Sequence, residues 1–183
     1  MVRKLFLLAA VVSIQVLFQG QQPATNPAAR LKGLPVSFEA NQGQVDSQVR
    51  FLAHAGQGTM YFTAGEAVLA LASRNSQKTT QISALRLKWV GANPEPQIVA
   101  EQPLPGRINY LIGRDPARWH TGIPTFARVR YRGLYPGVDA AFYGREGEIE
   151  YDLLVAPGTS LGKVSLAFSG HKSMTLAENG DLV

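Results

Sequence analysis

The chain has 183 residues, no cysteine, and 18 lysines and arginines against 13 aspartates and glutamates, which gives a formal net charge of +5. The lack of cysteine excludes disulfides, thiolate metal sites, a thiol nucleophile and a lipid-modified N-terminal cysteine. The small basic excess argues against a nucleic-acid-binding protein, because such proteins usually carry a concentrated basic face.

The first twenty residues have the order of a secretory signal peptide. Arg3 and Lys4 precede a mostly apolar run, Leu5 to Phe18. A helix of that length spans about 21 Å, which is shorter than the roughly 30 Å hydrocarbon core of a membrane. We therefore predict that residues 1–20 direct export and are removed, leaving no membrane span. The alternatives are an uncleaved anchor or a buried or interfacial helix. Export would place the mature chain in the periplasm, at the cell surface or outside the cell.

Residues 21–33 are predicted to form a flexible linker. This stretch is polar, contains two prolines and lacks an apolar period.

From Leu34 onward, short segments with strand-like composition alternate with glycine- and proline-rich turns. A spacing of about ten residues from one strand to the next favours an all-β sandwich or barrel, and we expect an antiparallel sandwich-like domain over residues 34–183. Residues 66–73 could instead form a short helix. The predicted strands are Pro35–Glu39, Gln48–Ala53, Thr59–Thr63, Ala67–Ala72, Gln81–Val90, Gln97–Ala100, Arg107–Ile112, Thr125–Tyr131, Val138–Tyr143, Glu148–Val155, Val164–Ser169 and Ser173–Leu176.

The C-terminal residues predict an incomplete domain. Asn179-Gly180 is a favoured pair for a two-residue hairpin turn, yet only Asp181 to Val183 follow it. We expect the chain to be cut from a longer protein at this point, although a frayed last hairpin is the alternative. No internal repeat is visible, so the chain alone does not form a propeller.

No catalytic, cofactor-binding or metal-binding motif is found. Ser169-Gly170-His171 lacks the first glycine of a nucleophile elbow, and the three histidines have no metal-ligand spacing. We therefore predict that the protein is not an enzyme and that it binds no cofactor or metal. Three acidic residues at alternate positions, Glu148, Glu150 and Asp152, leave a weaker hydrolase interpretation open, because a strand places them about 6.6 Å apart on one face.

The same acidic residues belong to a predicted charge ladder. Arg128, Arg130 and Arg132 alternate along one strand, and the acidic row Glu148, Glu150 and Asp152 follows two strands later. In an antiparallel meander the two rows would be about 9.6 Å apart across the small residue Ala141. Such a ladder would fix strand register and contribute a few tenths of a kcal/mol per exposed pair. The alternative is two unrelated solvated faces.

Four aromatic residues near these charges are candidates for a ligand surface, because their rings can stack on sugars or protein side chains. The equally ordinary alternative is packing in the core of the sheet. The four are Trp119, Tyr131, Tyr135 and Tyr143.

Several stretches together resemble the uncharacterised N-terminal domain of exported bacterial proteins that carry seven-bladed β-propeller repeats. The resemblance covers residues 34–183 and implies a β-rich extracytoplasmic module in front of a repeat region, with no known activity or functional residues. This sequence contains no propeller repeats. The stretches are residues 34–44 (LPVSFEANQGQ), 49–53 (VRFLA), 90–94 (VGANP), 103–106 (PLPG), 109–113 (NYLIG) with 115–116 and 119, 129–139 (VRYRGLYPGVD) and 150–158 (EYDLLVAPG).

These observations predict a non-catalytic structural or interaction module at the cell envelope, whose partner is the downstream propeller region of the same protein. The alternative is a carbohydrate-binding module or glycan-acting enzyme that uses the aromatics between Trp119 and Tyr143 on envelope polysaccharide. A third class, an adhesin for anionic polymers, would use Arg128, Arg130 and Arg132.

Overall fold

The computed structural model describes residues 36–55, 58–74 and 80–181, so the expected signal peptide and linker lie outside the described residues. The described part consists of ten strands and two 3-10 helices, with no α-helix, and the all-β prediction is confirmed. The elements are β1 (Phe38–Ala40), β2 (Phe51–Ala55), β3 (Gly58–Phe62), β4 (Glu66–Arg74), β5 (Thr80–Val90), β6 (Gln97–Tyr110), η1 (Pro116–Arg118), β7 (His120–Tyr135), β8 (Val138–Arg145), β9 (Glu148–Val155), η2 (Leu161–Lys163) and β10 (Ser165–Ser169).

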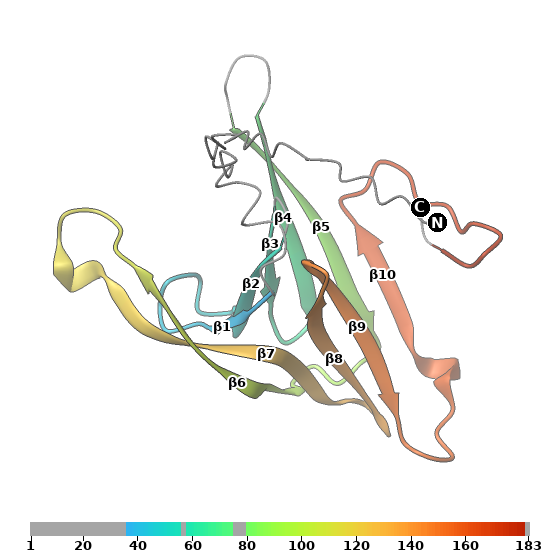
Figure 1. The fold of residues 1–183 in the computed structure, drawn as a ribbon. Coiled ribbons are helices and arrows are strands. Elements are labelled where there is room, and N and C mark those ends of the chain that lie inside the picture. The colour runs from blue at the N-terminus through green and yellow to red at the C-terminus, as the bar shows by residue number, and fades with distance from the viewer. Residues whose placement is uncertain (1–35, 56–57, 75–79, 182–183) are drawn as a thin grey trace, which may run out of the picture.

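All ten strands belong to one antiparallel sheet in the order β10-β5-β4-β3-β2-β1-β7-β8-β9, and β6 pairs with β7 beside this path. The sheet curls, so its two wings face each other (Figure 1). β6 and β7 extend beyond the rest of the sheet as a two-stranded arm, which is seen at the left of Figure 1 and ends in the loop that carries η1.

The sheet forks along β7. β6 pairs with β7 along residues 97–110 and occupies one edge of β7. The other edge is shared, because β1 pairs with Thr125 and Phe126 whereas β8 pairs with residues 128–135. One wing therefore contains β1 to β5 and β10, and the other contains β8 and β9.

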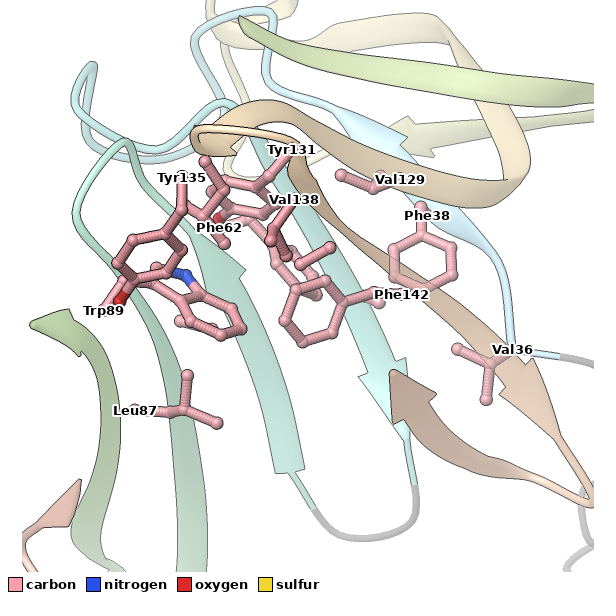
Figure 2. Packing of buried hydrophobic residues seen from close by; sticks show 14 residues of the cluster. Val36, Phe38, Phe62, Leu87, Trp89, Val129, Tyr131, Tyr135, Val138 and Phe142 are labelled. Carbon is pink, nitrogen blue, oxygen red and sulfur yellow. The ribbon is translucent and has the colours of Figure 1, made fainter. Parts of the chain in front are cut away.

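An aromatic core fills the space between the two wings. Figure 2 shows Phe62, Phe142, Tyr131 and Trp89 directed toward one another from four different strands. The ring centroids of Phe62 and Phe142 are 5.0 Å apart, and those of Tyr131 and Phe142 are 5.8 Å apart. Tilted and edge-to-face pairs of this kind stabilise a core beyond the effect of burial alone.

Apart from their bounds, the predicted strands agree with the sheet except at two places. Gln97–Ala100 and residues 107–110 of the predicted strand Arg107–Ile112 are parts of the single strand β6, which continues through Pro103 and Pro105 and ends at Tyr110. Prolines are tolerated there because β6 pairs on one side only and its register shifts between Pro103 and Arg107. The predicted strand Ser173–Leu176 is absent from the described residues, since only an isolated bridge occurs there. Residues 66–73, for which a helix was the alternative, form β4.

Within the described ranges, no helix is both long enough and apolar enough to span a membrane.

Candidate binding site

The short strand β1 buries its neighbouring side chains on opposite faces of the sheet. Phe38 pairs with Ala53 and Phe126 and packs in the aromatic core, where it is fully buried. Glu39 pairs with Leu52 and Thr125 on the opposite face, and its exposed fraction is only 1%. A carboxylate is rarely buried to this extent without polar partners, because loss of hydration is costly.

The partners of Glu39 come from two other strands. The hydroxyl of Tyr110, on β6, donates a hydrogen bond of 2.7 Å to Glu39 Oε2. His54 Nε2, on β2, lies 3.4 Å from Glu39 Oε1 and 3.2 Å from the Tyr110 hydroxyl. The other nitrogen of His54 lies 2.9 Å from the hydroxyl of Thr59 on β3. This polar cluster, made of Glu39, His54, Thr59 and Tyr110, therefore connects the arm to the body of the sheet.

Tyr110 is held in its protonated form by this environment. Burial raises the pKa of Tyr110 far above its ordinary value, and the hydrogen bond to Glu39 and the negative charge of that carboxylate raise the pKa further. Its hydroxyl is thus a fixed donor to Glu39, and the ring is held in one position beside the cavity described next.

A cavity of about 350 Å³ lies between the turn after β1 and the end of the arm. Its wall includes the ring of Tyr110, and the other lining residues are Gly43, Gln44, Ile112, Arg118 and His120. This volume is at the small end of the range for ligand pockets, about 300–1,000 Å³.

The turn that forms one wall is fixed by Asn41. The side-chain amide of Asn41 donates to the carbonyls of Asp46 at 2.8 Å and Val49 at 2.9 Å, and its oxygen accepts from the amide of Gly43 at 3.0 Å. Gly43 has φ = +105°, and a Cβ at this position would lie 3.1 Å from Cε1 of His120. Glycine therefore permits both the left-handed backbone and the close approach of His120.

The polar groups of the cavity are not equally available to a ligand. Gln44 donates to the carbonyl of Ala40 and accepts from the amide of Gln42, and the Tyr110 hydroxyl is bound to Glu39. By contrast, in the part of the chain that the structure describes, neither Arg118 nor His120 forms a salt bridge. The available groups are therefore one guanidinium and one imidazole.

Other chemistry at this site has little support. Over residues 36–55, 58–74 and 80–181, no group of three or more metal-ligating side chains is found. The residues that line the cavity include neither a carboxylate nor a serine, threonine or cysteine side chain.

The predicted charge rows lie on one face of a β7–β8–β9 meander. Arg130 pairs with Ala141, and Ala141 pairs with Asp152. In the same way, Arg128 pairs with Tyr143, and Tyr143 pairs with Glu150. The register thus has the arginine and acidic rows two strands apart, with Ala141 between them.

The arginines nevertheless bind nearer acids than those of the predicted ladder. Arg130 lies 2.7 Å from Asp139 on the adjacent strand and 3.6 Å from Glu101 on β6. Arg132 lies 3.3 Å from the same Glu101. The strands next to β7 are about 4.8 Å away from it, whereas β9 with its acidic row is about twice as far. The arginines of β7 therefore pair with the nearer carboxylates. These pairs also leave Arg130 and Arg132 less available to an anionic polymer.

Tyr143 joins the two rows indirectly. The guanidinium of Arg128 lies 5.6 Å from the centre of the Tyr143 ring, and the Tyr143 hydroxyl donates to Asp152 at 3.2 Å. Glu150 lies 3.7 Å from Arg145, and Glu148 is exposed. A depression of about 290 Å³ lies at Arg128, Tyr143 and Asp152. Because this face is largely exposed, each contact contributes about 1 kcal/mol or less.

The four candidate aromatics do not form one surface. Tyr131 and Tyr135 are buried in the core, so neither ring is available to a ligand. The Tyr131 hydroxyl donates to the carbonyl of Thr63, and the Tyr135 hydroxyl lies within hydrogen-bonding distance of the carbonyls of Val90 and Ser165. Their apolar rings fill the core while these bonds satisfy the hydroxyls, which corrects the prediction for both residues. Trp119 is exposed near the end of the arm, and Tyr143 lies on the outer face of β8.

A second exposed feature is an open seam between the edge strands β9 and β10. On β8 the core residues Val138 and Phe142 are each 1% exposed, whereas their partners on β9, Val155 and Tyr151, are 41% and 37% exposed. In the described sheet, β9 pairs only with β8 and β10 pairs only with β5. Both strands therefore have one unpaired edge.

Sequence reasoning missed Glu39, Tyr110, Arg118 and His120 as a site. A local signal was present, since Glu39 is the last residue of the predicted strand Pro35–Glu39 and lies between the apolar residues Phe38 and Ala40. The partner Tyr110 is 71 residues away, and only the fold brings the two together.

Comparison with known proteins gives one family. A family model described as a domain of unknown function, DUF7948, matches residues 38–183. No curated protein matches the chain. No solved structure matches it either.

Proposed function

The chain belongs to the DUF7948 family of domains of unknown function, and we propose that it is a non-catalytic interaction module of an exported protein. The observation that carries this proposal is the open seam between β9 and β10. Apolar side chains on these edge strands stay partly exposed although their neighbours on β8 and β5 are buried.

The seam offers two kinds of contact to a partner. The unpaired edges of β9 and β10 present backbone donors and acceptors, and an added strand can use them. Tyr151 and Val155 supply apolar area that a partner would remove from water, at about 25 cal/mol per Å².

The partner that we propose is a β-propeller region of the same protein, and this part of the proposal is supported by the sequence resemblance. A region that follows in the same chain would be joined to the edge strand β10 through residues 170–181. The N-terminal pattern of residues 1–20 supports export to the cell envelope or beyond.

Two measurements test this proposal. The reading frame after the codon for Val183 should encode propeller repeats, and an unrelated sequence there would contradict the choice of partner. Hydrogen exchange should then be compared between residues 34–183 and the longer chain. We expect slower exchange of the β9 and β10 amides in the longer chain, and unchanged exchange at both strands would contradict docking at the seam.

The alternative function is carbohydrate binding, and the cavity beside Tyr110 favours it. The predicted aromatic set does not support this alternative, because Tyr131 and Tyr135 are buried. A polar cavity with one aromatic wall, an arginine and a histidine, neither of which forms a salt bridge within the described ranges, nevertheless suits a small polar ligand.

A further inference from the structure

The end of the arm has an excess of positive charge around the cavity. Residues 107–120 contain Arg107, Arg114 and Arg118 against the single acid Asp115. The carboxylate of Asp115 accepts a hydrogen bond of 3.0 Å from the amide of Ala117 and caps η1. It forms no salt bridge with an arginine in the described residues, and of the three arginines Arg118 lines the cavity.

An anion in the cavity would have two donors. The guanidinium of Arg118 can bind a carboxylate through two parallel hydrogen bonds, and such charge-assisted pairs are stronger than neutral ones. The imidazole of His120 supplies a second donor. Both side chains line the same cavity, whereas the carboxylate of Glu39 is occupied by Tyr110 and lies beside His54 rather than among the lining residues.

The cavity also has an apolar surface. Ile112 is 72% exposed, which is unusual for a large aliphatic side chain, and it lines the cavity together with the ring of Tyr110. Because the Tyr110 hydroxyl is fixed by Glu39, its ring is held as a firm wall that can pack against the C–H face of a sugar.

We infer that this cavity binds a carboxylate-bearing sugar residue, such as a uronic acid at the end of an acidic polysaccharide. The carboxylate meets Arg118 and His120, and the pyranose ring lies against Tyr110 and Ile112. The volume of about 350 Å³ suits one such residue. This inference does not depend on the open seam, which lies on other strands.

The matched probes are D-glucuronate, D-glucose and acetate. D-Glucose has a hydroxymethyl group where D-glucuronate has its carboxylate, and acetate has a carboxylate but no ring. Amide chemical shifts of residues 34–183 should be followed by NMR as each probe is added. We expect D-glucuronate to move the amides of residues 42–44 and 110–120, and to bind more tightly than either of the other probes.

Two arginines of the same loop supply a matched pair of variants. Arg118 lines the cavity and Arg114 does not, although both are exposed and neither substitution should disturb folding. Arg118→Gln should weaken D-glucuronate binding about tenfold, as expected for the loss of one charge-assisted pair, while Arg114→Gln should leave it nearly unchanged.

Several results would overturn the inference. Equal affinity for D-glucose would exclude the carboxylate as the recognised group, and equal affinity for acetate would exclude the sugar ring. Equal losses in the two arginine variants would indicate a general effect of charge, and shifts confined to other strands would place binding elsewhere. An absence of shifts with all three probes at millimolar concentrations would also contradict it.

Discussion

Phe38 and Glu39 are neighbours on the same three-residue strand, and both are buried, yet they serve opposite sides of the molecule. Phe38 packs against Phe62, with ring centroids 5.5 Å apart, in a core that joins both wings of the sheet. Glu39 lies beneath the arm with Tyr110 and His54. The comparison indicates that burial on the aromatic side holds the fold, whereas burial on the polar side holds the shape of a cavity.

The largest expected effect is on the aromatic side. Phe142→Ala should lower the free energy of unfolding by about 3–5 kcal/mol, because it leaves a cavity among Phe62, Tyr131 and Trp89. Urea unfolding followed by circular dichroism measures this loss. Tyr151→Ala is the matched control, since its ring contacts Phe142 but is 37% exposed. If the control lost as much stability, the seam would be part of the closed core.

A smaller loss is expected from Glu39→Ala, which leaves the hydroxyl of the partly buried Tyr110 without its acceptor. An unpaired buried polar group costs about 1–3 kcal/mol. Glu39→Gln should lose less stability, because the amide oxygen still accepts the hydrogen bond. The same urea experiment compares them, and equal losses for the two variants would contradict the importance of this acceptor.

The loss of stability at alkaline pH should depend in part on Tyr110 of the polar cluster. The pKa of Tyr110 is raised in the folded state, chiefly by burial and then by Glu39, so the unfolded tyrosine ionises first. Its contribution to stability is therefore complete below about pH 10 and is lost as the pH rises further. Tyr110→Phe should show a shallower fall in the urea midpoint above pH 10 than the parent chain. If the urea midpoints of the variant and the parent chain fell equally above pH 10, the loss of stability would come from other groups. One such group is the buried Tyr131, whose pKa is also raised by burial.

The smallest effect is expected on the outer charged face. Arg130→Gln should change the free energy of unfolding by about 1 kcal/mol or less, since its pairs with Asp139 and Glu101 are partly exposed. The difference from the parent chain should shrink as salt is added. A loss of several kcal/mol would show that this face contributes to the fold as much as the core does.

The sequence predicted features that depend on short-range alternation. The predicted strand Gln81–Val90 lies within β5, and the meander of β7, β8 and β9 has the register in which Arg130, Ala141 and Asp152 align. Each of these follows from period-two patterns and short turns between neighbouring strands.

Features that depend on distant segments were not predictable in the same way. Tyr131 alternates with Arg130 and Arg132, so it lies on the opposite face of β7, but only the fold shows that the other wing covers that face, as Trp89 covers Tyr131. Tyr110 and Glu39 meet only because the sheet forks at β7. Alternation determines which residues share a face of a strand, whereas long-range pairing determines which face is covered.

The most direct test of the comparison is the unfolding free energy of the double variant Glu39→Leu with Tyr110→Phe. Replacing both partners of a buried polar contact by apolar groups is often nearly neutral. If the polar cluster serves the cavity rather than the fold, the double variant should unfold in urea within about 1 kcal/mol of the parent chain. A loss close to that of Phe142→Ala would show that the polar side of β1 holds the fold together, and it would contradict the division proposed here.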